Sequence, residues 1–304
     1  MDYQKILDEL HDAIKAIEHK GKVASYIPEL ADVHPDKLGV HLTTVDGENY
    51  GCGDSEEKFS IQSIAKVLSL VMAYELEGET LWRRVDVEPP GTPFNSLVQL
   101  EHDLGKPRNP MINAGALVIC DILMSRLEKP KKEILAFIRK IAGDDTITYD
   151  ETVAKSEMQT GYRNLALLNL MKAFKNIDNG VWEVFELYCN LCSIEMNCAQ
   201  LSKTFLLFAA DGTDPKTGER FLTGSKTKRI NSIMQLCGFY DEAGEFSFKV
   251  GLPGKSGVGG GIVAVLPAQY SIAVWSPPLN AKGNSYKGME FLERFTTETE
   301  HSIF

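Results

Sequence analysis

Apolar residues recur every three or four positions at the start of the chain, which predicts an amphipathic helix over residues 3–19. Apolar and polar residues then alternate over 38–44, a pattern typical of a strand. The turn signal Asp46-Gly47 follows, and a second short run continues through 50–52. The first fifty or so residues therefore predict one helix and one β-hairpin.

The centre of the chain has the longer apolar spacing of helices. The run from Ile61 to Leu76 contains neither Gly nor Pro and predicts a buried helix that begins near Ser60 to Ser63. Residues 78–112 are rich in Pro, Gly and Asn, which predicts an extended loop. Six helical segments follow, split by Pro, Gly or Asp-Asp: 112–126, 130–142, 149–157, 161–175, 180–194 and 198–210.

The apolar period returns to two after the charged turn 211–220. Three strands are predicted there, over 246–250, 261–266 and 270–274. A last amphipathic helix ends the chain, with an apolar face that contains Met289, Leu292 and Phe295.

These elements predict an α+β protein: a five-stranded antiparallel sheet flanked by the N- and C-terminal helices, with an inserted all-helical domain. We expect residues 1–68 and 205–304 to form the α/β sheet domain and residues 69–204 to form the helical domain. A cleft between two such domains is the expected ligand site.

Composition narrows the function classes. The chain of 304 residues is 43% hydrophobic and 24% charged, as in globular proteins, and its net charge of -10 opposes binding to nucleic acid or to an anionic membrane. No apolar stretch approaches the roughly 20 residues that span a bilayer, and the mean hydropathy is -0.15. The acidic N-terminus lacks the features of a secretory signal, so we expect a cytoplasmic protein.

Metal, redox and nucleotide chemistry find little support. The six scattered cysteines predict reduced thiols, and the C-x-x-C of Cys189 and Cys192 lacks the second pair or βαβ context of a metal or redox site. The six histidines include no metal-binding pair and offer poor candidates for a catalytic triad. Gly254-Lys255-Ser256 lacks the upstream glycine of a phosphate-binding loop and leads into a strand. No cofactor is therefore expected.

Ser63-Ile64-Ala65-Lys66 is the strongest candidate for chemistry. A spacing of three places Ser63 and Lys66 on one helix face, about one turn apart. A desolvated lysine there can lose its proton near neutral pH and deprotonate the serine, while the helix N-terminus supports an oxyanion. A second Ser-x-x-Lys, Ser225 to Lys228, lies in a charged stretch where we expect a turn and solvated lysines.

Serine–lysine acyl enzymes also carry a Lys-Ser/Thr-Gly run on an edge strand beside the nucleophile. Lys216-Thr217-Gly218 lies in a polar turn, whereas Lys255-Ser256-Gly257 precedes a glycine-rich strand. The backbone N–H groups of Ser63 and Val258 are then the expected oxyanion hole. A glycine bulge without catalytic meaning is the alternative for this second run.

Tyr188-Cys189-Asn190 lies between those two motifs in chain order, in the position of a third motif of such enzymes. The order of the three motifs and the interrupted sheet resemble the penicillin-recognising serine hydrolases. Longer sequence motifs resemble one family in particular, the serine-dependent glutaminases. These motifs are FSIQSIAKV at 59–67, PRNP at 107–110, INAGA at 112–116, LCSIE at 191–195, VGLP at 250–253 and KSGV at 255–258.

The resemblance implies a nucleophile at Ser63 and a base at Lys66, with Tyr26 and Tyr240 as further catalytic residues. It implies substrate contacts at Gln62, Ser63, Asn113, Glu157, Asn164, Tyr188, Tyr240 and the backbone of Val258. Free glutamine carries an ammonium and a carboxylate, which fits a carboxylate such as Glu157 and amide or phenol donors. Without the resemblance, Glu157 is expected to be a solvated charge and Asn113 a helix cap.

The expected reaction is hydrolysis of the side-chain amide of L-glutamine to L-glutamate and ammonia through an acyl-serine intermediate. The sequence leaves open whether Lys66, Tyr26 or Tyr240 delivers the proton to the leaving group. A β-lactam hydrolase or peptidase on the same scaffold is a second hypothesis, and a non-catalytic amino-acid sensor is a third.

Self-association is the expected use of apolar residues near the end of the chain. Ile303 and Phe304 are predicted to be exposed. We expect a homo-oligomer, a dimer or a homotetramer, as the resemblance implies.

Overall fold

The computed structural model describes residues 1–18, 20–89 and 97–304, and its centre is a five-stranded antiparallel sheet. The strand order is β2-β1-β8-β7-β6, formed by Asn49–Gly53, Gly39–Thr44, Tyr270–Trp275, Gly261–Leu266 and Gly254–Ser256. The turn between β1 and β2 contains Gly47 at φ +89°, a left-handed conformation that glycine adopts without strain. The predicted fold class and the N-terminal hairpin are confirmed.

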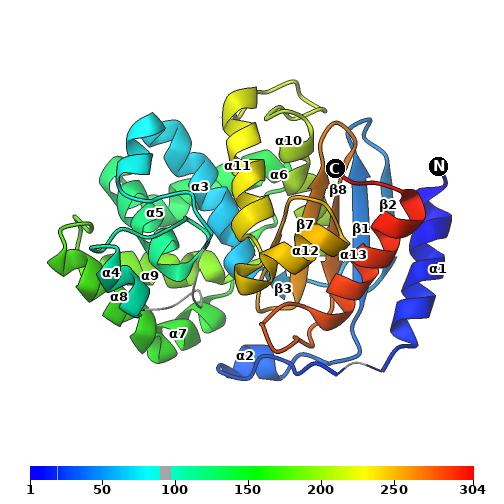
Figure 1. The fold of residues 1–304 in the computed structure, drawn as a ribbon, viewed down its shortest axis with the longest axis horizontal. Coiled ribbons are helices and arrows are strands. Elements are labelled where there is room, and N and C mark those ends of the chain that lie inside the picture. Colours follow the sequence, from blue (N-terminus) through cyan, green and yellow to red (C-terminus); the bar gives the residue numbers. More distant parts are fainter. Residues whose placement is uncertain (19, 90–96) are drawn as a thin grey trace.

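Helices cover both faces of this sheet (Figure 1). The terminal helices α1 (Tyr3–Lys15) and α13 (Tyr286–Thr299) contact each other and share one core cluster with Ile262, Ile272 and Val274. On the other face α10 (Cys198–Ala209) packs against β1, β7 and β8, and here Val263 and Ala273 belong to a second core cluster. Because successive side chains of β7 and β8 enter two different cores, both strands are buried throughout and mostly apolar.

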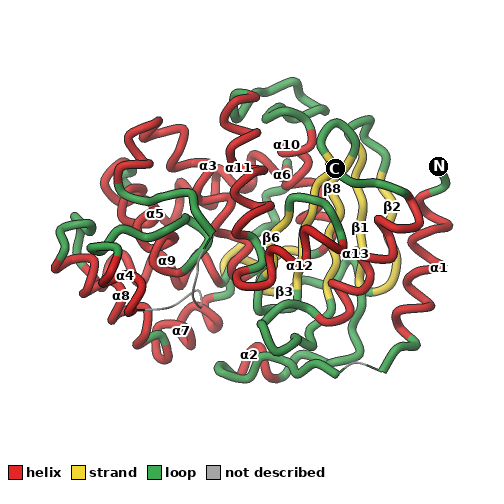
Figure 2. The backbone as a smooth tube through the Cα atoms, in the orientation of Figure 1, coloured by secondary structure: helices red, strands yellow, loops and turns green. Residues whose placement is uncertain are grey.

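Most of the remaining helices form a bundle beside the sheet, as Figure 2 shows. They are α3 (Ala65–Glu77), α4 (Leu97–His102), α5 (Asn113–Arg126), α6 (Pro130–Ala142), α7 (Glu151–Thr160), α8 (Tyr162–Ala173) and α9 (Val181–Cys192). The core cluster under α10 continues into this bundle. For most helices of this region, the predicted bounds lie within two or three residues of the observed ones.

A second, small sheet was not predicted. Its strand order is β3-β5-β4, formed by Phe59–Ser60, Ile194–Met196 and Thr148–Tyr149, so the stretch predicted as helical contains two short strands. Strands of two or three residues leave almost no periodic signal in a sequence. This sheet matters for the site because β3 leads directly into Ser63.

The predicted strand over 246–250 is wrong. Residues Ala243–Lys249 form helix α12, and β6 is the edge strand instead. Phe246 is fully buried and its ring stacks on Phe239, whereas Phe248 is 89% exposed, so the two do not share a buried face.

Helix α11 (Gly224–Cys237) was also missed, and Ser225 lies on it rather than in a turn. Its sequence is rich in Ser, Thr, Lys and Asn, which weakens the apolar period. The predicted loop over 78–112 includes a 3₁₀ segment, Gly78–Arg83, and helix α4, while its residues 90–96 lie outside the described residues. Three further short elements are α2 (Pro28–Ala31), η1 (Gln62–Ile64) and η3 (Tyr240–Glu242).

No helix among the described residues is both long enough and apolar enough to span a membrane. All six cysteines are free, and five of them are buried. The division into residues 1–68 plus 205–304 and residues 69–204 stays a prediction.

Candidate active site

Ser63 lies in a strand–turn–helix junction. Strand β3 pairs with β5, and the Ile61 N–H donates to the Ile194 carbonyl at 2.9 Å, which fixes the chain just before the turn. Gln62 then adopts φ +50°, a left-handed conformation that is unfavourable for a residue with a side chain. Helix α3 starts two residues after Ser63, so the serine stands at its N-terminal end.

Lys66 is buried on the first turn of α3. Its Nζ donates to the Asn113 Oδ1 at 2.6 Å and to the Met111 carbonyl at 3.2 Å, both of which are uncharged acceptors. Burial lowers the pKa of Lys66 to about 8, against weaker opposing contributions from Cys192, Cys120 and Glu157. An appreciable fraction of Lys66 is therefore neutral near physiological pH and able to accept a proton.

The loop after β6 packs directly against the turn that holds Ser63. A Cβ at Gly257 would lie 2.5 Å from the Ile61 carbonyl oxygen, and one at Gly259 would lie 2.2 Å from the Ser60 carbonyl oxygen. Only glycine permits so close an approach of two backbones. Val258, between these glycines, is thereby held beside the Ser63 turn.

Two N–H groups at this contact are left unused by the backbone. In the part of the chain that the structure describes, neither the Ser63 N–H nor the Val258 N–H donates to a backbone carbonyl. The Gly259 carbonyl is anchored by the Trp275 indole N–H at 3.0 Å. A fixed loop with two such donors can bind an oxyanion.

Tyr240 and Tyr188 enclose the serine and the lysine. Tyr240 shares a side-chain hydrogen bond with Ser63, and burial raises the pKa of its phenol. The Lys66 Nζ lies 5.8 Å from the centroid of the Tyr188 ring and 5.9 Å from that of Tyr240. Tyr188, on α9, hydrogen-bonds the Cys192 side chain, and burial raises its pKa well above the ordinary value. Both phenols are therefore neutral over the physiological range.

Glu157 supplies a half-buried carboxylate on α7. The Tyr26 hydroxyl donates to it at 2.6 Å, and the Gln62 side chain hydrogen-bonds it as well. Burial raises the pKa of Glu157, while these two hydrogen bonds oppose that shift. The 47% exposed Tyr26 has a phenol pKa well above the ordinary value because of burial at this contact and the nearby Glu157 charge.

Asn113 and Asn164 link the lysine to the helical bundle. Asn113 is the first residue of α5, and its amide accepts from Lys66 and donates to the Asn164 Oδ1 at 3.0 Å. Asn113 is not the N-cap, which is Ile112. These contacts connect all the site residues named from the sequence into one cluster, apart from the second Ser-x-x-Lys on α11.

One charged residue in the cluster has no role in the sequence-based assignment. Lys255, on β6, is fully buried with its Nζ 4.2 Å from the centroid of the Tyr240 ring. In the sequence, the Lys255-Ser256-Gly257 motif could have pointed to this lysine. The motif was used there only to predict that the following Val258 N–H is an oxyanion donor.

The fold and this cluster define a class. An antiparallel sheet of β-lactamase-like arrangement, a Ser-x-x-Lys at a helix start and a Lys-Ser-Gly edge strand are features of serine–lysine hydrolases. The glutaminase family model matches residues 21–304.

Curated relatives and solved structures agree over the whole chain. The glutaminase of Christiangramia forsetii is 60% identical over 304 residues, with full coverage of both chains. That of Saccharophagus degradans is 59% identical, covering 100% of this chain and 99% of its own. A solved structure described as the probable glutaminase ybaS has a TM-score of 0.94 at 33% identity, covering 99% of this chain and 97% of that one. A Bacillus glutaminase solved in 4.3 M NaCl has a TM-score of 0.87 at 34% identity, covering 98% and 99%.

The chain belongs to the glutaminase family and is an enzyme, a hydrolase that acts on the amide of glutamine. The resemblance stated from the sequence is confirmed, and the glutaminase hypothesis stands over the β-lactam hydrolase and the sensor.

Proposed function

We propose that Ser63 is the nucleophile and Lys66 the general base in hydrolysis of the side-chain amide of L-glutamine. Neutral Lys66 takes the Ser63 proton, and the serine oxygen adds to the amide carbon. The C–N bond then breaks, ammonia leaves, and a glutamyl ester of Ser63 remains. Water cleaves that ester, giving L-glutamate and restoring the serine hydroxyl.

The oxyanion of each tetrahedral intermediate binds the N–H groups of Ser63 and Val258. The close packing at Gly257 and Gly259 supports this assignment because it holds the Val258 loop against the serine turn. Preorganised donors of this kind stabilise the transition state without having to reorient during the reaction.

Tyr240 is the better candidate for relaying the proton to the leaving group. It hydrogen-bonds Ser63 directly, whereas the Tyr26 hydroxyl is engaged by Glu157 at 2.6 Å. Its raised pKa keeps a proton on the phenol that can be passed to the departing nitrogen while Lys66 replaces it. Tyr26 is then a residue that orients Glu157.

The α-ammonium and α-carboxylate groups of glutamine are both on one carbon, two methylene groups from the reacting amide, so their partners lie together at one end of the substrate site. Glu157, held by Tyr26 and Gln62, is the partner of the α-ammonium group. Asn113, Asn164 and the Tyr188 hydroxyl carry amide and phenol groups, and they are assigned to the α-carboxylate. A substrate lacking either charge leaves a partner unpaired in the site, which is how free glutamine is selected.

The depressed pKa of Lys66, three residues from Ser63 on one helix turn, is the observation that carries this mechanism. Its test is ammonia release from L-glutamine by the wild-type protein and by Ser63→Ala. The expected result is loss of turnover in Ser63→Ala with unchanged circular dichroism, because no other hydroxyl occupies the nucleophile position.

The matched control is Ser225→Ala, at the exposed serine of the second Ser-x-x-Lys on α11. This variant should retain wild-type activity. Ammonia release by Ser63→Ala at the wild-type rate would end the nucleophile assignment, and wild-type protein that releases none from glutamine would end the proposed function.

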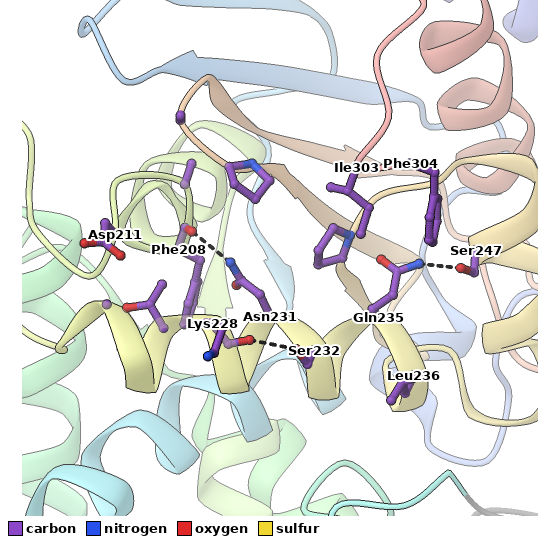
Figure 3. Close-up of a pocket in the computed structure, with 16 residues that line it drawn as sticks. Phe208, Asp211, Lys228, Asn231, Ser232, Gln235, Leu236, Ser247, Ile303 and Phe304 are labelled. Carbon is purple, nitrogen blue, oxygen red and sulfur yellow. Dashed lines mark hydrogen bonds between the residues drawn. The ribbon is translucent and has the colours of Figure 1, made fainter.

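We also propose that the enzyme is cytoplasmic and self-associates. The six free cysteines support a reducing compartment. A groove of about 670 Å³ between α11 and the last two residues supports an apolar contact surface (Figure 3). Leu236 and Phe304 line this groove and also an adjoining hollow that contains Phe248. We assign this surface, called here the α11 groove, to contact with a second copy of the chain.

A further inference from the structure

Lys255 is a buried lysine whose hydrogen bonds all go to the backbone around it. Its Nζ donates to the Gly238 carbonyl at 2.9 Å and to the Ser256 carbonyl at 2.6 Å, and the residue is 0% exposed. Burial and the charge of Lys66 lower its pKa well below the ordinary value, so the position is electrostatically unfavourable for a lysine. Burial of a lysine at this position is energetically unfavourable, which suggests that Lys255 has a function.

The segment that Lys255 contacts carries Tyr240. Gly238 lies two residues before Tyr240, and the Lys255 Nζ is 4.2 Å from the centroid of the tyrosine ring, within the range of a cation–π contact. The ammonium thus touches both the backbone before Tyr240 and the ring itself.

Tyr240 needs such support because its backbone is strained. It adopts φ +56° without being glycine, a conformation that persists only where the surroundings hold it. Gln62, next to Ser63, is the other site residue with this feature, at φ +50°. The placement of Tyr240, which hydrogen-bonds Ser63, and of Gln62, which precedes it, therefore depends on neighbouring contacts.

A second set of buried contacts holds the far side of the Tyr240 turn. The Ser256 hydroxyl donates to the Asn284 Oδ1 at 2.5 Å, and the Asn284 amide donates to the Glu242 carboxylate. Asn280 also donates to Glu242, at 2.9 and 3.0 Å. Lys255 and Ser256 therefore fix the turn from both ends, through Gly238 and through Glu242.

We propose that Lys255 is a positioning residue that holds the Tyr240 phenol against Ser63 and does not contact the substrate. In this chain the lysine of the Lys-Ser-Gly strand acts through the tyrosine. The inference rests on the proposed roles of Ser63 and Tyr240.

A double-mutant cycle between Lys255 and Tyr240 tests it. Lys255→Met keeps the length of the side chain and removes the ammonium, and Tyr240→Phe removes only the hydroxyl. Lys255→Met alone should lower kcat for glutamine by about 10- to 100-fold with KM within about threefold, because the substrate is not its partner. In the Tyr240→Phe background the same change should lower kcat by less than about threefold, because the group being positioned is already absent.

Lys287→Met is the matched control. Lys287 is also buried, and its Nζ donates to a backbone carbonyl, that of Lys15 at 3.1 Å, between α13 and the end of α1. This variant should leave kcat unchanged, which separates the loss of any buried ammonium from the loss of this one. If Lys255→Met is unfolded by circular dichroism, Lys255→Gln, which keeps an N–H donor, takes its place in the cycle.

Three results would overturn the inference: an unchanged kcat in Lys255→Met, a loss confined to KM, or losses that multiply fully in the double variant. The last two would make Lys255 a substrate-binding or independent catalytic group. An active wild type with inactive Ser63→Ala leaves the proposed function standing in each of these cases, so the two failures are distinguishable.

Discussion

A lysine can serve as a base near neutral pH only where the protein disfavours its ammonium form. At Lys66 burial does this, and both hydrogen-bond acceptors of the Nζ are uncharged carbonyl oxygens. The pKa of Lys66 is about 8, so at lower pH its ammonium form predominates and cannot take the Ser63 proton. We therefore expect kcat/KM for glutamine to rise with pH, about tenfold per unit below this pKa, and to level off above it.

The measurement is the pH dependence of kcat/KM by ammonia release, in buffers of constant ionic strength. Lys66→Arg is the control, because a guanidinium stays protonated across this range, and it should be inactive at every pH. A profile that stays flat through neutral pH in the wild type would contradict the role of Lys66 as base.

Glu157 gives a prediction about substrate binding. Glu157→Gln keeps the shape of the side chain and the Tyr26 contact but removes the charge that we assign to the substrate ammonium. Hydrogen bonds to charged groups contribute about 1.5–3 kcal/mol, so we expect kcat/KM for glutamine to fall by about 10- to 100-fold, mainly through KM. Steady-state kinetics of ammonia release measure this split.

Glu151→Gln is the control for Glu157→Gln, because Glu151 also lies on α7, where it pairs with Lys131, and has no assigned substrate contact. It should leave KM unchanged. A Glu157→Gln enzyme with wild-type KM would remove Glu157 from the ammonium site.

The roles of single residues in this site are hard to predict from the sequence pattern around each of them. Without the family resemblance, Glu157 is expected to be solvated and Asn113 to be a helix cap, because the local sequence contains no sign of a distant partner. The partner of Glu157 is Tyr26, 131 positions earlier, and that of Asn113 is Lys66, 47 positions earlier. Ser63, Lys66 and the Val258 N–H had a chemical rationale independent of the resemblance to the glutaminases, because each belongs to a short local motif.

At the scale of elements, the loop after β6 holds Val258, whose N–H is the proposed second donor to the oxyanion. Gly259→Ala would place a Cβ 2.2 Å from the Ser60 carbonyl oxygen, so one of the two backbones must move. Loss of one oxyanion donor costs about 10²- to 10³-fold in kcat, and we expect a decrease of about 100-fold in kcat for this variant.

Gly244→Ala is the matched control for Gly259→Ala. A Cβ at Gly244, on α12, meets no atom within 4 Å. Alanine should leave kcat unchanged and raise the free energy of unfolding by about 0.5–1 kcal/mol, measured in urea, because it replaces glycine within a helix. Wild-type kcat in Gly259→Ala would contradict the predicted part of this loop in the oxyanion hole.

The elements that could be predicted have a sustained apolar signal. Helices α6 and α9 have one apolar face, whereas α5, β7 and β8 are runs of mostly apolar residues, and the bounds of all five were close to those observed. The errors fall where the pattern is short or ambiguous.

Helix α12 shows why an apolar pattern alone can predict the wrong element. Its Phe246 and Phe248 are two positions apart, which suggests a strand, but only Phe246 has a partner, the ring of Phe239. The exposed Phe248 instead belongs to the surface beside the α11 groove. In the sequence, an apolar residue on the surface cannot be distinguished from one that fills a core.

At the scale of the whole molecule, the site lies where separate elements converge. Ser63 comes from the turn after β3, Val258 from the loop after β6, and Tyr188 from α9. The core cluster beneath them is continuous from the sheet residue Val263 into the helical bundle. The arrangement of the site therefore depends on how the bundle packs on the sheet.

The α11 groove leads to the prediction of a homo-oligomer. Phe248 and Phe304 are 89% and 82% exposed, and Leu236, which lines the same hollow, is 51% exposed, so this face presents apolar surface that a second copy would cover. Sedimentation velocity at micromolar concentration should give a mass that is a multiple of 33.7 kDa. Leu236→Glu should shift the distribution to lower mass, because a buried, unpaired carboxylate opposes association.

Trp182→Glu is the matched control, because Trp182 is 65% exposed on α9, which contributes no residue to the α11 groove. It should sediment as the wild type does. Since Leu236 lies outside the catalytic cluster, the dissociated Leu236→Glu protein also shows whether one copy alone hydrolyses glutamine, through its kcat at the concentration of the sedimentation run. A wild-type monomer, or a Leu236→Glu protein of unchanged mass, would contradict contact through this groove.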